Sequence, residues 1–386
     1  MRRQCEAVTG RVAARLRVAA ATSLALLAAA GCRSSTESGS GGPPATMMLG
    51  ADVSALARIE QGGGVFRDGG QAGDAIAILR AHGSRLFRLR LFVNPNDSDV
   101  QVNDLPYTLA LAQRIKAAGA KLLLDFHYSD TWADPGHQTT PTAWAGLAFD
   151  SLVKTVETYT AGVVAQLKRA GALPDIVQVG NEIDAGMLWP LGRLYVAGAD
   201  TLAEWVQFTQ LLKAAIRGVR DSLGPADTVR VMLHYSQGGS TGGTQWFLDH
   251  MNGYGVPYDR VGLSYYPWWH GTLAQLEANL QATASRYGRD IVVVETSYPW
   301  RAGGWESMVT VPGAMPWAAS PAGQAQFARD LVAAVASTPG GHGAGVVWWY
   351  PEAIQVPGLF VWGGGSLALF DSTGNVLPAA SALGGQ

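Results

Sequence analysis

The chain has 386 residues, of which 48% are hydrophobic and 15% charged, and its formal net charge is −2. This composition supports a large folded core and excludes an intrinsically disordered protein. A mildly acidic chain without a basic run also argues against a nucleic-acid-binding protein.

The N-terminus is typical of an export signal. Residues 1–31 combine five arginines with the apolar stretch 18–30, which is too short to cross a membrane and suits the hydrophobic part of a signal peptide. Gly31-Cys32 is similar to a bacterial lipoprotein cleavage site, although Ala29 stands where Leu is more usual. We therefore expect a lipoprotein-type signal peptide with Cys32 lipidated, and ordinary secretion is the alternative.

Residues 32–46 are rich in Ser, Gly and Pro and show no periodicity, so we expect a flexible linker. The folded part then covers residues 47–386. The cysteines of the chain are Cys5 and Cys32, so the folded part contains no disulfide and no thiolate metal site.

Within the folded part, eight short apolar runs are typical of β-strands: 48–54, 85–93, 121–128, 175–182, 229–235, 260–266, 290–296 and 344–350. Apolar residues at helical spacing lie between them, at 72–82, 105–118, 149–170, 203–222, 272–287 and 322–337, with a shorter candidate at 246–251. Strands that alternate with helices and are apolar on both faces indicate a parallel sheet covered on both sides.

Eight such units predict an α/β fold, a (β/α)8 TIM barrel that forms a single domain. An open doubly wound sheet is the alternative, but the glycines after the first strand lack the spacing of a phosphate-binding loop.

Polar residues cluster at the C-terminal ends of the predicted strands. They include Asp52, Arg88, Arg90, Asp125, His127, Asn181, Glu182, His234, Tyr265, Tyr266, Glu295, Trp348 and Trp349. Active sites of barrel enzymes lie at that face, so these side chains are expected to converge on one site.

Glu182 and Glu295 each end a buried apolar run, in VQVGNE and IVVVET. A single glutamate there could simply be a buried, salt-bridged residue, because an unpaired buried charge is destabilising. Two carboxylates across a barrel mouth suit glycosidic cleavage, in which one acts as an acid and the other attacks the sugar or activates water. We expect Glu295 to be held in its charged form by the arginines of the second strand, and Glu182 to cycle between acid and base.

Several further residues are candidate substrate-binding or supporting groups. Asn181 could bind the sugar hydroxyl next to the reacting carbon, and His127 and His234 could hold hydrogen bonds around the carboxylates. Arg88 and Arg90 share one face of their strand, so one of them could serve only to pack the barrel interior. Seven histidines without an HExxH-like pair make a zinc site improbable.

Tryptophans at or after the strand ends favour a carbohydrate cleft, because sugar rings stack on aromatic planes, although each could instead be packing. We expect Trp268 and Trp349 to bind substrate, together with Tyr265 and Asp52. Either Tyr265 or Tyr266 could contact the nucleophile, because only one of two adjacent residues can point into the barrel. The whole set comprises Trp132, Trp144, Trp189, Trp268, Trp269, Trp300, Trp348, Trp349 and Trp362.

The chain resembles glycoside hydrolase family 53, the arabinogalactan endo-β-1,4-galactanases. The resemblance is carried by GADVSALARIE (50–60), RLRLFVNP (88–95), LLLDFHYSDTWADPGHQTTPTAW (122–144), VQVGNEIDAGMLWPLG (177–192), SYYPWWHGTL (264–273) and VVVETSYPW (292–300). It implies a TIM-barrel catalytic domain, endo-cleavage of galactan with retention of configuration, Glu182 as acid/base and Glu295 as nucleophile.

The loops after the seventh and eighth strands depart from the bacterial members of that family. RAGGWESMVTVPGAMPWAAS and PEAIQVPGLFVWGGGS hold few hard oxygen ligands, so we predict neither calcium nor any other cofactor. Two alternatives stay open, a related barrel hydrolase that acts on another β-1,4-glycan and an inactive surface glycan-binding protein. We further expect a monomer whose partner is galactan and whose membrane contact is limited to the lipid anchor.

Overall fold

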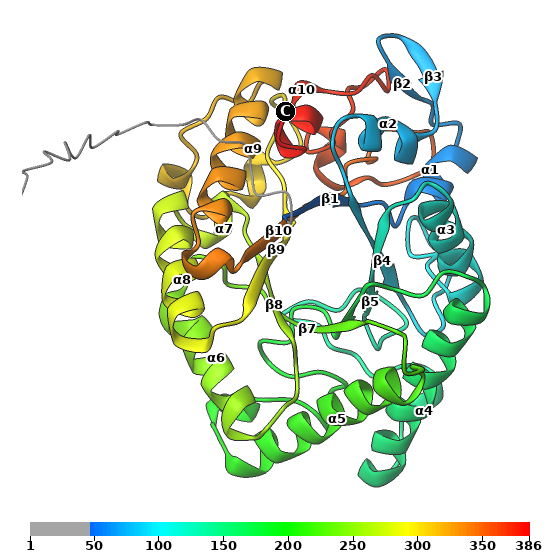
Figure 1. Ribbon diagram of the computed structural model, residues 1–386, viewed down its shortest axis with the longest axis vertical. Helices are drawn as coiled ribbons and strands as arrows, with labels where there is room; N and C mark the ends of the chain where they lie inside the picture. Colours follow the sequence, from blue (N-terminus) through cyan, green and yellow to red (C-terminus); the bar gives the residue numbers. More distant parts are fainter. Residues whose placement is uncertain (1–46) are drawn as a thin grey trace, which may run out of the picture. The chain divides into compact units, whose positions relative to one another are not determined.

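The computed structural model describes residues 47–386, which form a closed barrel of eight parallel strands surrounded by helices (Figure 1). The strands follow the order β1-β10-β9-β8-β7-β6-β5-β4 around the barrel. Their bounds are β1 Met48–Asp52, β4 Leu86–Leu91, β5 Lys121–Phe126, β6 Ile176–Val179, β7 Arg230–Tyr235, β8 Arg260–Ser264, β9 Asp290–Thr296 and β10 Gly343–Trp349. The predicted (β/α)8 barrel and all eight predicted strands are therefore confirmed.

The helices that cover the barrel are α2 Ala75–Ala81, α3 Leu105–Ala117, α4 Phe149–Arg169, α5 Leu202–Asp221, α6 Thr241–Gly253, α8 Leu273–Tyr287 and α9 Pro321–Ala336. The sequence begins several of them with a side chain that accepts a main-chain N–H. Asp74 and Asp104 do so for α2 and α3, and Thr201 with Glu204 forms a reciprocal cap for α5. The predicted helices match these within a few residues, except that α6 is much longer than 246–251.

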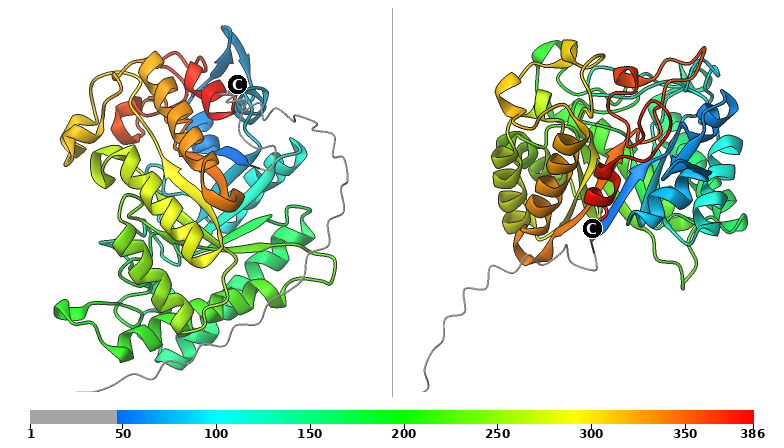
Figure 2. Two further views of the ribbon diagram at one scale, coloured as in Figure 1. Left: turned by 60° about the vertical axis from the view of Figure 1, so that its left-hand side comes forward. Right: turned by 90° about the horizontal axis from the view of Figure 1, so that it is seen from above.

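Smaller elements lie between these units. They are α1 Leu56–Gln61, the antiparallel pair β2 Phe66–Asp68 and β3 Gln71–Gly73, α7 Pro267–His270 and α10 Pro378–Leu383. Long connections to the covering helices follow β1, β5, β6 and β9, a long segment also follows β10, and Figure 2 (right) shows the loops gathered at one end of the barrel. This end is formed by the C-terminal ends of the strands.

The barrel interior changes from apolar to polar along the strands. Alternate residues point inward, so a layer of aliphatic side chains that includes Leu86, Leu123, Ile176 and Met232 fills the lower part. Two residues further along the same strands stand Arg88, Asp125, Gln178 and His234, all of them buried. The strict two-residue period therefore places a polar layer directly beneath the C-terminal mouth.

Strand β9 breaks this period just before Glu295. Leu263 and Ser264 of β8 pair with Val293 and Glu295, so Val294 is an extra residue in β9. Val294 belongs to the interior aliphatic layer, and regular alternation would turn the next side chain outward. The bulge instead lets Glu295 face the interior as well, which is a common use of bulges beside active sites.

Among residues 47–386, no helix is both long enough and apolar enough to span a bilayer. The expected signal peptide (1–31), the linker (32–46) and the lipidation site Cys32 lie outside the described residues and stay predictions.

Candidate active site

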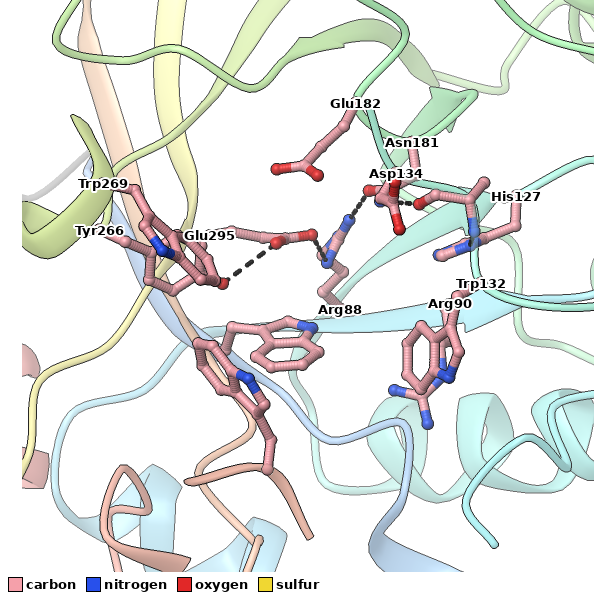
Figure 3. A pocket seen from close by; sticks show the side chains of 13 residues that line it. Arg88, Arg90, His127, Trp132, Asp134, Asn181, Glu182, Tyr266, Trp269 and Glu295 are labelled. Carbon is pink, nitrogen blue, oxygen red and sulfur yellow. Dashed lines mark hydrogen bonds and ion pairs between the residues drawn. The ribbon is translucent and has the colours of Figure 1, made fainter. Parts of the chain in front are cut away.

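A cavity of about 220 Å³ opens at the C-terminal mouth of the barrel (Figure 3). Its lining combines charged and aromatic side chains from most of the strand ends: Arg88, Arg90, His127, Trp132, Ala133, Asp134, Asn181, Glu182, Tyr266, Trp269, Glu295, Trp349 and Trp362. A second hollow shares Asp134, Glu182 and Trp269 with this cavity and is otherwise lined by Pro135, Ser236, Gln237 and His270. Glu182 thus lines both the cavity and the second hollow, whereas Glu295 lines only the cavity.

Glu295 is held by two donors. One carboxyl oxygen lies 2.8 Å from Arg88 Nη1, and the hydroxyl of Tyr266 donates to the other over 3.1 Å. The expectation that an arginine of the second barrel strand holds Glu295 is confirmed for Arg88. Both contacts stabilise the carboxylate form and fix its orientation.

Glu182 has a different environment on the facing side of the cavity. Its side chain points towards Glu295 in Figure 3, and the hydroxyl of Ser264 donates to its Oε1 atom over 2.6 Å. No arginine or lysine contacts this carboxyl group among the described residues. Its backbone has a φ of 45°, a strained conformation for a non-glycine residue that is typical of functional sites.

The two carboxyl groups therefore differ in how tightly they hold a proton. Burial raises the pKa of Glu182 well above its usual range, and the charge of Glu295 adds to this. Burial also raises the pKa of Glu295, but Arg88 and Tyr266 oppose the rise. When the pair holds one proton, that proton is consequently on Glu182.

Arg88 is the centre of a buried ionic network in which every nitrogen of its guanidinium group has a partner. Nη1 contacts Asp52 at 3.0 Å, Nη2 contacts Asp125 at 2.8 Å and Asn181 at 2.7 Å, and Nε donates to Gln178 over 3.3 Å. Burial alone lowers the pKa of Arg88, but the surrounding carboxylates outweigh it and raise the pKa overall.

Asp125 links Arg88 to His127, whose Nε2 atom lies 3.0 Å from the aspartate. Burial by itself raises the pKa of Asp125, and the charges of Arg88 and His127 reverse this, so that the pKa is lowered. The network therefore keeps an ionised carboxylate beneath the cavity floor and fixes the arginine that contacts Glu295.

Aromatic side chains form one wall of the cavity. Trp132 lies 6.2 Å from Trp349, and Trp362 lies 4.6 Å from Trp349 and 6.0 Å from Trp269, as measured between ring centroids. The guanidinium of Arg90 packs 4.4 Å from the centre of the Trp132 ring. This places the Arg90 side chain as a rigid support for an aromatic platform, a role distinct from that of Arg88.

Comparison with known proteins assigns this arrangement to a family. The family model described as "Glycosyl hydrolase family 53" matches residues 48–383. The chain belongs to glycosyl hydrolase family 53. A family 53 catalytic domain from Ignisphaera aggregans superposes with a TM-score of 0.80 and 32% identity, over 89% of this chain and 98% of that one.

Curated relatives cover similar shares of the chain. "Uncharacterized protein in bgaB 5'region" from Niallia circulans is 41% identical over 87% of this chain and 93% of its own length. "Probable arabinogalactan endo-beta-1,4-galactanase A" from Aspergillus terreus is 36% identical over 89% of this chain and 97% of its own length.

Most of the predicted site residues of this family 53 protein reach the cavity. Arg88, Arg90, His127, Asn181, Glu182, Glu295 and Trp349 line it. Asp52 and His234 do not, because both are fully buried beneath it. Asp52 binds Arg88, and His234 binds Ser264 and Asn181, so each contacts groups that hold the site and not the substrate space.

Tyr265 and Trp268, which were expected to bind substrate, do not line the cavity. Tyr265 follows the outward-facing parity of β8, stacks on Phe327 and donates its hydroxyl to Gly271 O, so Tyr266 occupies the site instead. Trp268 is fully buried against Tyr266 within α7, and its neighbour Trp269, 38% exposed, lines the cavity. In both pairs the adjacent residue lines the cavity.

Ser264, Gln178 and Asp134 also belong to the site, although they were not predicted from the sequence. The parity of β8 would have indicated Ser264, since Gly262, Ser264 and Tyr266 alternate with the apolar Val261, Leu263 and Tyr265. Among residues 47–386, no group of three or more His, Cys, Asp or Glu side chains is arranged to hold a metal ion.

Proposed function

We propose that this protein is an endo-acting β-1,4-galactanase that cleaves (arabino)galactan with retention of anomeric configuration. One observation carries the proposal: Glu182 and Glu295 share one cavity, yet only Glu295 is bound by a cation and a phenol. This asymmetry separates a proton donor from a nucleophile. The galactan substrate is supported by relatives of the same family, such as the Aspergillus terreus protein named above.

In the first step Glu295 attacks the anomeric carbon and Glu182 protonates the glycosidic oxygen, so the leaving chain departs as an alcohol. Arg88 and Tyr266 aim the Glu295 carboxylate and keep it ionised until it attacks. The raised pKa of Glu182 provides the proton at neutral pH.

In the second step Glu182, now ionised, removes a proton from water, and the water attacks the same anomeric carbon. The bond to Glu295 breaks, and its carboxylate returns to its two donors. Two inversions at one carbon give overall retention. The mechanism requires carboxyl groups about 5–5.5 Å apart, since a water molecule need not fit between them before the first attack.

The remaining lining residues bind and orient the sugar. Asn181 holds Ala133 O with one N–H of its amide, which leaves the second for the hydroxyl beside the anomeric carbon. Trp132, Trp349 and Trp362 provide the stacking surface on the Glu295 side of the cleft. The hollow beyond Glu182 accommodates the leaving part of the chain, because the proton donor borders both regions.

The decisive experiment is a product profile on linear β-1,4-galactan, with xylan, mannan and cellulose as controls. The proposal expects internal cleavage of galactan, a rapid loss of viscosity, and β-configured products by NMR immediately after cleavage. Activity on another glycan but not on galactan would indicate a related barrel hydrolase. Binding of galactan without cleavage would indicate a surface glycan-binding protein.

Azide rescue separates the roles of the two glutamates. Glu182→Ala should still be glycosylated by a substrate with a good leaving group, and azide should restore turnover with a product of retained configuration. Glu295→Ala forms no covalent intermediate, so azide should give an inverted product. Losses of several powers of ten on galactan are expected for both variants. The reverse stereochemical pattern would exchange the two roles.

The location proposed for the enzyme is the outer side of a bacterial membrane, where Cys32 carries lipid and residues 33–46 act as a tether. The support is the sequence of the N-terminal segment alone. We propose that this enzyme acts as a monomer on galactan side chains of pectin. Loss of the membrane-bound fraction on Cys32→Ala would support the anchor, and light scattering of the catalytic domain would test the monomer.

A further inference from the structure

Ser264 and His234 are buried side chains that have no role in the proposed reaction so far. They form a hydrogen-bond chain with Glu182, in which Ser264 contacts Glu182 and His234 contacts Ser264. The hydroxyl of Ser264 donates to Glu182 Oε1 over 2.6 Å, and His234 Nε2 lies 2.9 Å from the same hydroxyl oxygen. Both residues are fully buried, at the ends of β8 and β7. The contact pairs the candidate acid/base with one serine and one imidazole.

The neighbours of His234 Nδ1 fix the direction in which the hydrogen bonds between His234, Ser264 and Glu182 run. His234 Nδ1 lies 3.0 Å from Gln178 Nε2 and 3.3 Å from the main-chain N of Glu182, and both of these atoms are donors. The Nδ1 atom therefore accepts, and the ring proton is on Nε2. Burial and the charge of Arg88 hold the pKa of His234 well below its usual range, so the ring is neutral and carries one proton.

Asn181 Oδ1, the acceptor that also lies 2.9 Å from Nδ1, does not alter this direction. It already accepts from Arg88 Nη2 over 2.7 Å, and the two N–H groups of Gln178 Nε2 are available for Asp125 Oδ1 at 2.7 Å and His234 Nδ1 at 3.0 Å. With the ring proton on Nε2, His234 donates to Ser264, and the serine hydroxyl has to donate to Glu182. Oε1 is then an acceptor, so a proton on Glu182 is carried by Oε2.

Oε2 has no hydrogen-bond partner among the described residues, and the Glu182 side chain lines both parts of the cleft. His234 also holds the backbone beyond Glu182, because its carbonyl accepts from the N–H of Ile183 over 3.0 Å. The same histidine thus contacts Glu182 through its ring and through Ser264, and contacts the next residue, Ile183, through its carbonyl.

We propose that Ser264, oriented by His234, is a positioning residue that directs the Glu182 proton to Oε2 and stabilises the ionised Glu182 needed for the second step. This inference rests on the acid/base role proposed for Glu182. In the first step Oε2 gives its proton to the leaving oxygen, and in the second it takes one from water, while the Ser264 hydrogen bond to Oε1 stays in place.

Other charges around Glu182 act against its ionised form. Glu295, Asp184 and Asp134 all raise the pKa of this carboxyl group, and the hydrogen bond from Ser264 lowers it. The groups that face His234 are Arg88, Asp125, His127 and His270. Loss of the serine hydroxyl should therefore raise the pKa of Glu182 further and disfavour the base form.

The kinetic test compares Ser264→Ala with Ser264→Thr, which keeps a hydroxyl. For Ser264→Ala we expect the alkaline limb of kcat/KM on galactan to move up by about one pH unit. An aryl β-galactobioside with a good leaving group should show a burst, and kcat and KM should fall together because the second step is slowed. Ser264→Thr should restore the limb position and abolish the burst.

Ser297→Ala is a matched control, because Ser297 is a buried serine two residues from Glu295 whose hydroxyl has no partner within residues 47–386. A loss of rate in Ser264→Ala with no limb shift and no burst would show a merely structural role and overturn the inference. An equal limb shift in Ser297→Ala would do the same.

The ring proton can be observed without any activity measurement. In ¹⁵N-histidine-labelled wild type, with His234 assigned by comparison with His234→Gln, the nitrogen shifts should report a neutral ring protonated at Nε2. A ring protonated at Nδ1 would reverse the direction of the hydrogen bonds from His234 through Ser264 to Glu182, and would overturn the inference. Failure to cleave galactan would refute the proposed function instead, and would leave this spectrum unchanged.

Discussion

Replacing Arg88 tests whether one buried cation holds the site together. Arg88→Met removes the charge but keeps a chain of similar length, and Arg88→Lys keeps the charge but not the planar group. The guanidinium contacts three carboxylates and Asn181 at 2.7–3.0 Å. A lysine ammonium has three N–H donors and cannot reproduce these contacts.

The magnitude follows from what each variant leaves unpaired. Arg88→Met leaves Asp52 and Asp125 buried without their cation, and breaking a buried pair is destabilising by about 3–5 kcal/mol. Total stabilities of domains are about 5–15 kcal/mol, so this loss is a large fraction of the whole. For Arg88→Lys we expect about 1–3 kcal/mol, the usual effect of an unsatisfied buried acceptor.

The assay is urea unfolding of both variants and wild type between pH 4 and pH 7. In wild type the pKa of Asp125 is lowered, so its contribution to stability is present above the unfolded pKa and is lost as pH falls through the folded pKa. In Arg88→Met the buried carboxyl groups lack their cation and should bind protons more readily as pH falls, which relieves the penalty. The difference from wild type should therefore be largest at pH 7. A penalty that does not change with pH, or a fully stable Arg88→Met, would refute the reasoning.

Three further outcomes are expected. Tyr266→Phe should lower kcat/KM on galactan about 10–100-fold, because it removes a charge-assisted hydrogen bond from Glu295. Tyr265→Phe should affect stability and leave kcat/KM within about threefold of wild type, and the reverse ranking would contradict the assignment. Trp269→Ala should raise KM for galactan about tenfold, whereas Trp246→Ala should leave KM unchanged, because Trp246 is similarly exposed but lies away from the cavity. Equal effects of the two substitutions would argue against a stacking role for Trp269. Burial raises the pKa of Glu352 to about 8, so the folded state binds a proton that the unfolded state lacks, and its stability falls as pH rises from about 4.5 to 8. Glu352→Gln should remove this dependence and be more stable than wild type by about 1–3 kcal/mol at pH 8. If the free energy of unfolding in urea depends on pH equally in both proteins, Glu352 is excluded as the source.

The barrel could be predicted from the sequence because its strands carry a simple signal. A strand buried on both faces reads as a continuous apolar run, and eight such runs alternate with amphipathic helices. The short elements α1, α7, α10 and the β2–β3 hairpin could not be predicted in this way. Each is too brief for a periodic pattern, and packing on the finished barrel decides its conformation.

The site was predictable to the extent that strand parity fixes direction. Arg88 and Arg90 point inward with the parity of Leu86, and the same rule would have selected Tyr266 in place of Tyr265. Parity failed at Glu295, where a bulge in β9 turns two consecutive side chains to the interior. The position of Trp269 depends on the short turn of α7, which no period describes.

Depth within the barrel explains why Asp52 and His234 differ from the residues that line the cavity. Both are fully buried, and the guanidinium of Arg88 binds Asp52 as well as Glu295, which lines the cavity. A fully buried carboxylate or imidazole of this kind can influence the substrate space only through a group such as Arg88 or Ser264. Polar strand ends therefore mark the active site of this family 53 barrel, but they do not distinguish groups that meet the sugar from groups that hold those in place. The distinction appears only when the register of all eight strands sets the height of each side chain.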